Sequence, residues 1–129
     1  MQQKKTTKEE YQKCVNVVVE YINQHLGEDI DLKSLARISN FSPFYFHRIM
    51  KAFLGEPIGT FIVRTRTEAA ARLLRYSDVP IADIAYRIGY SSPSSLSKVF
   101  KQFYSISPLE YRNNKNFVIM KPAIIRPDL

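Results

Sequence analysis

Hydrophobic residues recur at steps of three and four along most of the chain, the spacing of one face of an α-helix. The first such stretch, about residues 8–26, predicts an amphipathic helix. Further helices are expected at about 32–39, 43–54, 57–76, 81–88, 93–104 and 108–113. Strand-type alternation is nearly absent before the last fifteen or so residues, so the pattern predicts an all-α fold of about seven helices.

Two stretches of the sequence are copies of one another. Residues 32–53 read LKSLARISNFSPFYFHRIMKAF, and residues 81–103 read IADIAYRIGYSSPSSLSKVFKQF. Before the central turn the copies align at an offset of 49, as in the pair Leu35/Ile84, and after it at an offset of 50, as in Phe53/Phe103. Each copy is a short apolar helix, a tight turn and a second helix, which is the outline of a helix-turn-helix.

The turn and capping residues agree with this outline in both copies. Asn40 and Gly89 stand at the turns and belong to the residue types that enter the left-handed region most cheaply. Gly27 is expected to close the first helix in the same conformation. The second helix of each copy is expected to start with a serine N-cap and a proline at its first position, Ser42-Pro43 and Ser92-Pro93.

The second helix of each copy has two distinct faces. The stripes expected to be buried are Phe46, Ile49, Met50 and Phe53 in the first copy, and Leu96, Val99, Phe100 and Phe103 in the second. The outward sets are Phe44, His47, Arg48 and Lys51, and Ser94, Ser95, Ser97, Lys98 and Lys101. A helix needs no such exposed basic and polar set for its own stability, so these faces are candidates for reading a partner.

The formal net charge of +7 suggests a polyanionic partner, although ordinary solubility charge would give the same total. Its distribution favours the partner, because residues 43–75 carry six basic and two acidic side chains whereas residues 1–42 are neutral overall.

Several function classes are disfavoured. Cys14 is the single cysteine, which excludes an intramolecular disulfide and a Cys-rich zinc site, and no metal or cofactor is expected. No Gly-rich phosphate loop and no nucleophile elbow occur, which argues against an enzyme. No apolar run approaches bilayer length, so no membrane partner is expected and a cytoplasmic, nucleoid-associated location follows.

Double-stranded DNA fits the two outward faces. The major groove takes an α-helix, and Arg48 can bind guanine O6 and N7 in bidentate fashion, while Lys98 reaches them as a point charge. Lys51, Lys101 and the arginines of the 57–76 helix suit phosphates. Two recognition helices that enter one face of the duplex must lie about one helical turn apart, roughly 34 Å. The long helix expected between them has a length of the same order, about 28 Å. Since the readers differ, an asymmetric site is predicted.

Alternatives remain at this point. Phe44 and Tyr45 could belong to the first core, which is the favoured reading for Tyr45, and the arginines of the long helix could form a solvated face. The whole chain could instead be an architectural DNA binder with little sequence preference, or a protein-interaction module that reads no DNA.

Residues 30–112 resemble the DNA-binding domain of the AraC/XylS family of bacterial transcription regulators. The resemblance rests on IADIAYRIGY in the second copy, on SPLEYR shortly after that copy, and on LKSLARISNFSPFYFHRIMKAF in the first. It implies two helix-turn-helix units joined by a long helix and entering successive major grooves. It places base-reading positions at Phe44, His47 and Arg48, and at Pro93, Ser94, Ser95, Ser97 and Lys98.

The expected organisation is a first subdomain at 1–56, a linker helix at 57–76, a second subdomain at 77–113 and an extended tail at 114–129. The tail resembles the linker into a small-molecule-binding domain of the GyrI-like type, which implies an effector bound through a domain outside this chain. RNA polymerase is the further partner expected of such a regulator.

Overall fold

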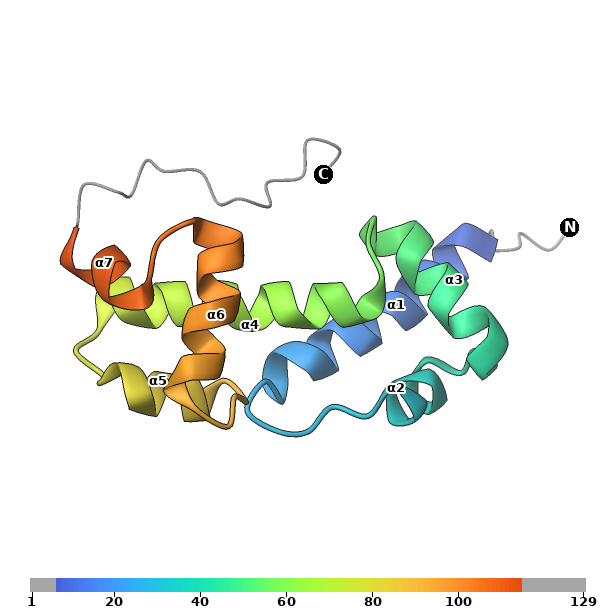
Figure 1. Ribbon diagram of the computed structural model, residues 1–129. Coiled ribbons are helices and arrows are strands. Elements are labelled where there is room, and N and C mark those ends of the chain that lie inside the picture. The colour runs from blue at the N-terminus through green and yellow to red at the C-terminus, as the bar shows by residue number, and fades with distance from the viewer. Residues whose placement is uncertain (1–6, 115–129) are drawn as a thin grey trace, which may run out of the picture. The chain divides into compact units, whose positions relative to one another are not determined.

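The computed structural model describes residues 7–114, which form seven α-helices and no strand (Figure 1). The helices are α1 (Thr7–Gln24), α2 (Leu32–Ser39), α3 (Pro43–Leu54), α4 (Ile58–Tyr76), α5 (Ile81–Arg87), α6 (Pro93–Tyr104) and α7 (Pro108–Asn113). The all-α prediction is confirmed, and the expected helix ends agree within two residues, the usual uncertainty of a helix boundary. The extended conformation predicted for the tail falls on residues 115–129, outside the described part.

The chain divides into two compact units. The first contains the described residues up to His25 together with Asp29–Ile62, and the second contains Leu26–Glu28 and the chain from Val63 onward. The division falls inside α4, so this helix contributes residues to both units. The subdomain limits expected at residues 56 and 76 stay a prediction.

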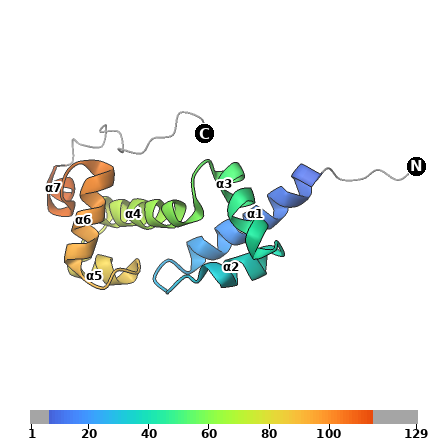
Figure 2. The same ribbon diagram turned by 45° about the vertical axis from the view of Figure 1, so that its right-hand side comes forward.

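The first unit is built around one hydrophobic core. Helices α1, α2 and α3 pack against one another, as both ribbon views show (Figures 1 and 2). The fully or almost fully buried side chains at its centre are Val15, Val18, Ile22, Leu35, Phe46, Met50 and Ile58. Of the four residues predicted to line the inner face of α3, Phe46 and Met50 are buried and the other two are partly buried.

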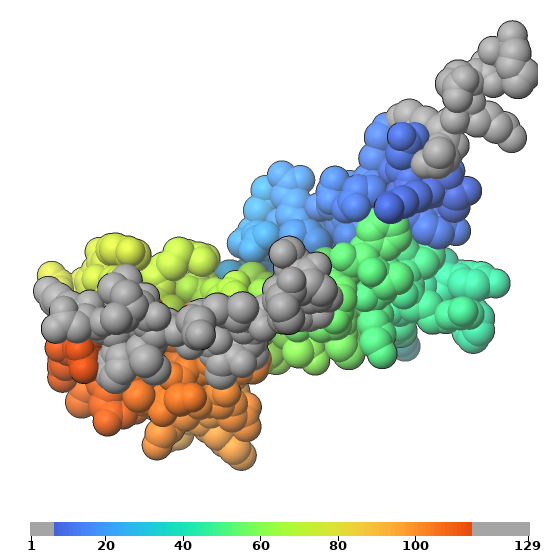
Figure 3. All heavy atoms as spheres, turned by 90° about the horizontal axis from the view of Figure 1, so that it is seen from above, coloured from blue at the N-terminus to red at the C-terminus, as the bar shows by residue number. Residues whose placement is uncertain are grey.

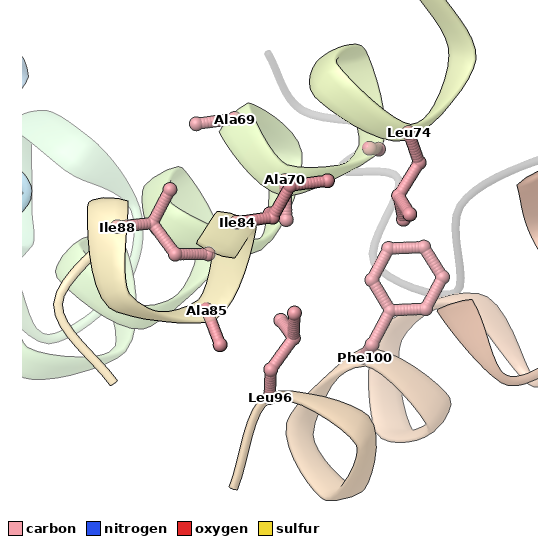
Figure 4. Packing of buried hydrophobic residues seen from close by; sticks show 9 residues of the cluster. Ala69, Ala70, Leu74, Ile84, Ala85, Ile88, Leu96 and Phe100 are labelled. Atoms are coloured by element: carbon pink, nitrogen blue, oxygen red, sulfur yellow. The ribbon is translucent and has the colours of Figure 1, made fainter. Parts of the chain in front are cut away.

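The second unit has its core between α4, α5 and α6. Figure 4 shows Leu96 and Phe100 of α6 pointing toward side chains of the other two helices, with Phe100 opposite Leu74. The alanines of α4 at 69–71 are all buried, and Ala70 is completely so. Alanine carries too little hydrophobicity to stand out in a pattern, yet its small side chain lets neighbouring helices approach closely.

Serine caps start three helices. Ser42, Ser92 and Ser107 each accept a hydrogen bond from a backbone N–H three residues further on, which confirms the first two as the predicted caps. At α7 the cap is reciprocal, because the Glu110 carboxylate also accepts the backbone N–H of Ser107 at 3.0 Å. Hydrogen bonding to the carboxylate from the backbone N–H of Ser107, and then from the Ser107 side chain, lowers the pKa of the Glu110 carboxyl.

The left-handed turns are confirmed at Asn40, with φ of 68°, and at Gly89, with φ of 101°. The expectation for Gly27 is wrong, because α1 ends at Gln24 and Gly27 has no positive φ. Glycine is needed there for space instead: a Cβ on Gly27 would lie 2.5 Å from the carbonyl oxygen of Arg87. The segment after α1 thus packs closely against the end of α5.

Arg66 holds this close contact in place. Its Nε donates to the carbonyl oxygen of Leu26 at 3.0 Å, and its Nη2 donates to that of Glu28 at 2.9 Å. A Cβ on Gly89 would lie 2.6 Å from the same Leu26 oxygen and 3.0 Å from the Arg66 guanidinium. The turn between α5 and α6 is therefore packed against the 26–28 segment with no room for a side chain.

Arg112 ties α7 to the end of α4. Its Nε donates to the carbonyl oxygen of Leu74 at 3.1 Å, and its Nη2 donates to those of Leu73 and Ser77 at 3.3 and 3.1 Å. The last carbonyls of a helix lack intrahelical partners, and a guanidinium is suited to satisfy several at once. The final arginine of SPLEYR is thus a structural residue of the second unit.

Three aromatic rings pack where α6 meets α7. Tyr104 stacks on Phe100 with centroids 4.5 Å apart, and Tyr111 lies edge-on to both. Burial, followed by the nearby Glu68 carboxylate, raises the pKa of Tyr104 to about 12.

The end of α6 offers a test of the repeat. Ser105 holds a left-handed φ of 69° at the position where α3 is followed by Gly55, with φ of 78°. Since this conformation costs a non-glycine residue roughly 1 kcal/mol or more, we expect Ser105→Gly to raise the free energy of unfolding by about 1 kcal/mol in urea denaturation. Ser97→Gly, the same change inside α6, should lower it. Equal losses in both variants would contradict this account of Ser105.

The pKa of Tyr104 predicts a late-titrating phenol. The folded state disfavours the Tyr104 phenolate, so the protonated phenol contributes to the free energy of unfolding. This contribution is fully present below the ordinary pKa of 10.0 and is lost as pH rises from there toward about 12. Titration of the tyrosines by NMR should show one ring changing near pH 12 in the folded protein. Tyr104→Phe should remove that signal and the accompanying loss of stability; a late signal that persists in this variant would show that another tyrosine produces it.

Candidate nucleic-acid interface

The outer face of α3 is presented by a capped helix with a buried inner face. Ser42 Oγ accepts the backbone N–H of Tyr45 at 3.3 Å, and Pro43 occupies the first position, where no amide donor is needed. All four residues predicted for this face are exposed, namely Phe44, His47, Arg48 and Lys51. In Figure 3 the green to teal atoms of α3 reach the molecular surface.

Tyr45 differs from its prediction. The sequence favours a core position for Tyr45, yet 53% of this residue is exposed, and Phe44 beside it is 69% exposed. The two rings lie edge to face with centroids 5.1 Å apart. The core assignment is therefore wrong, and the start of α3 carries a pair of exposed aromatic rings.

The polar members of the α3 face keep their hydrogen-bonding groups available. Arg48 and Lys51 have no ion-pair partner among residues 7–114. His47 sets its ring edge-on to the buried Phe46, with centroids 5.4 Å apart. The ring nitrogens of His47 make no intramolecular hydrogen bond in the described part of the chain.

The outer face of α6 is smaller and more polar. Ser94, Lys98 and Lys101 are exposed, whereas Pro93, Ser95 and Ser97 are partly buried. The hydroxyl of Ser95 lies 3.1 Å from that of Ser92 and shares a hydrogen bond with it. Ser95 is therefore partly engaged in holding the helix start. The orange atoms of α6 also reach the surface in Figure 3.

The arginines of α4 behave differently from the readers. Arg64 pairs with Glu68 at 3.1 Å, Arg66 binds the carbonyls described above, and Arg75 lies over the Tyr111 ring at 4.6 Å. Phosphate binding by these three residues would have to replace intramolecular contacts. Arg72 is the exposed arginine of this helix.

Sequence reasoning gave one residue the wrong preference and missed two others. The sequence favours a core position for Tyr45, because an aromatic residue beside a buried stripe is usually part of the core. The exposed cations Lys33 and Arg37 were passed over because α2 was treated as a support alone. Their i, i+4 spacing on a short helix was the available signal.

Within residues 7–114, no three His, Cys, Asp or Glu side chains gather as metal ligands would. None of the described helices has the length and apolar character needed to cross a membrane.

Comparison with known proteins places these features in a family. The family model described as a helix-turn-helix domain matches residues 35–114. Over 96 residues the chain is 38% identical to the regulatory protein PocR of Salmonella typhimurium. The aligned region covers 74% of this chain and 32% of PocR. Over 103 residues the chain is 29% identical to the regulatory protein SoxS of the same organism, covering 80% of this chain and 96% of SoxS.

A solved structure agrees. The DNA-binding domain of AdpA, a global transcriptional factor crystallised in complex with a target DNA, superposes with a TM-score of 0.73 at 30% identity, covering 77% of this chain and 89% of that domain. The chain spans about a third of the length of PocR. The match over residues 35–114, the identity to PocR and the shared fold together show that this chain belongs to the AraC-type helix-turn-helix family of DNA-binding transcription regulators.

Proposed function

We propose that this chain is the sequence-specific DNA-binding part of a transcription regulator and that it places α3 and α6 in successive major grooves of one duplex. The observation that carries the proposal is Arg48, which is exposed on the outer face of α3 and has no ion-pair partner within residues 7–114, while the inner face of α3 is buried. A guanidinium held in this way has the fork geometry that matches guanine O6 and N7. The chain then acts by binding and not by catalysis.

The first reader supplies most of the base discrimination. Arg48 reads guanine, His47 donates to a purine N7 or a phosphate, and Phe44 contacts a thymine methyl group. Tyr45, exposed beside Phe44, extends this apolar contact toward the sugar. Lys51, one turn further along α3, binds a phosphate.

The second reader supplies smaller groups. Ser94, Ser97 and Lys98 face the bases, while Lys101 binds a phosphate. Pro93 and Ser95 contribute the shape of the helix start more than hydrogen bonds, because Ser95 shares its hydroxyl with Ser92. Since the two faces differ in chemistry, the preferred site has two unlike halves, which a single copy of the chain can occupy.

The wider role follows from family membership and extends beyond the described residues. We propose that the bound protein contacts RNA polymerase, that a small-molecule effector acts through a domain outside this chain, and that the protein works in the cytoplasm at the nucleoid. The length of PocR beyond the matched third is compatible with such an additional domain.

Selection from a random duplex pool tests the proposal. The wild-type chain should enrich a two-part asymmetric motif. Arg48→Ala should relax one half and weaken binding to the selected duplex by about 1–3 kcal/mol, the usual contribution of a bidentate base contact. Lys98→Ala should relax the other half, with a smaller loss because a point charge discriminates less.

Lys8→Ala, which removes an exposed cation from α1, is the matched control and should leave the motif unchanged. Circular dichroism confirms that each variant is folded. Binding with no enriched motif would point to an architectural DNA binder, and absence of duplex binding at low salt would point to a protein-interaction module; either result overturns the proposal.

A further inference from the structure

A hollow of about 400 Å³ lies beside α2 in the first unit, lined by Lys33, Ala36, Arg37, Phe41 and Pro43. Its floor is apolar, formed by Ala36 and the Phe41 ring, which is fixed by an edge-on contact with Tyr11 at 5.1 Å. The two cations, Lys33 and Arg37, are the charged members of this lining. The hollow thus combines a rigid apolar floor with positive charge.

Both cations are free to bind an anion. Lys33 and Arg37 are exposed and stand four residues apart on one side of α2, and their side chains have no hydrogen-bond or ion-pair partner within residues 7–114. The nearest acid along the chain, Asp31, uses one carboxylate oxygen to accept the backbone N–H of Lys33 and the other to accept the Ser34 hydroxyl. Its carboxylate therefore caps α2 and does not pair with the Lys33 ammonium.

The hollow adjoins the first reader. Pro43 forms one of its walls and is also the first residue of α3, immediately before the exposed Phe44. In a helix-turn-helix the supporting helix crosses the DNA backbone while the N-terminal part of the second helix meets the bases. A phosphate of the strand that flanks the reader would then come to rest between the two cations.

We propose that this hollow is a binding site for the DNA backbone, in which Lys33 and Arg37 hold one phosphate and the apolar floor receives the adjoining sugar. The proposal rests on the DNA-binding function proposed above. Lysine and arginine donate charge-assisted hydrogen bonds to phosphate oxygens, and such contacts fix register without reading sequence.

The corresponding positions on α5 of the second unit carry no cation. At the offset of 49 that aligns the supporting helices, Lys33 corresponds to Ala82 and Arg37 to Tyr86, both exposed on α5. Among the described residues, the pair of cations proposed to hold a phosphate is therefore not repeated on α5. It adds to the difference between the two halves, since the unit with the richer base-reading face also carries the additional backbone contact.

The test is the salt dependence of binding by the full chain to its selected duplex. The double variant Lys33→Gln/Arg37→Gln should reduce the slope of log K against log salt by about 0.9, the value for one phosphate contact. Affinity at low salt should fall about tenfold, as expected for a lost charge-assisted contact. The enriched motif should stay that of the wild type. Lys8→Gln is the matched control and should change neither slope nor motif.

The outcomes separate this inference from the proposed function. If the wild type enriches a motif but the double variant keeps its slope, the hollow binds no phosphate and the regulator proposal stands. If the double variant changes the motif itself, the two residues read bases and the phosphate assignment is wrong. If the wild type binds no duplex at any salt concentration, both proposals fall together.

Discussion

Each reader helix is only twelve residues long, and a helix of that length is marginal in water on its own. Packing of its inner face is therefore what makes it a helix at all. In α3 this face is anchored by Phe46 and Met50, and in α6 by Leu96 and Phe100, all fully buried. Because the inner face is fixed, the opposite side chains point outward, so the exposed face of each helix follows from the packing of the core.

The two units reach the same arrangement by different local means. The first turns at Asn40, whose left-handed conformation an asparagine side chain tolerates. The second turns at Gly89, where the approach of Leu26 and the Arg66 guanidinium leaves no space for any side chain. The second turn is thus held by contacts from distant parts of the chain, whereas the first depends on a local preference.

Most of the fold could be predicted from the sequence because its signals are local. Helix periodicity, the Ser-Pro starts of α3 and α6 and the left-handed turns at Asn40 and Gly89 all depend on residues within a few positions, and the sequence predicts them. What could not be predicted depends on contacts between distant segments. The space required at Gly27, the carbonyls bound by Arg66 and Arg112, and the burial of Ala70 all arise from tertiary packing that no sequence window contains. For the candidate site, the outward faces followed from the period, but the exposure of Tyr45 did not, because a neighbour on a helix can belong to either face.

The separation between inner and outer faces has an evolutionary consequence. Phe44, Arg48 and Lys98 make little contact with the core, so replacing them costs the fold almost nothing. If these positions read bases as proposed above, substitutions there can change the preferred operator sequence while the protein remains folded. Gly27 and Gly89 have no such freedom, and a lineage that changes them must first rebuild the packing around Arg87 and Leu26.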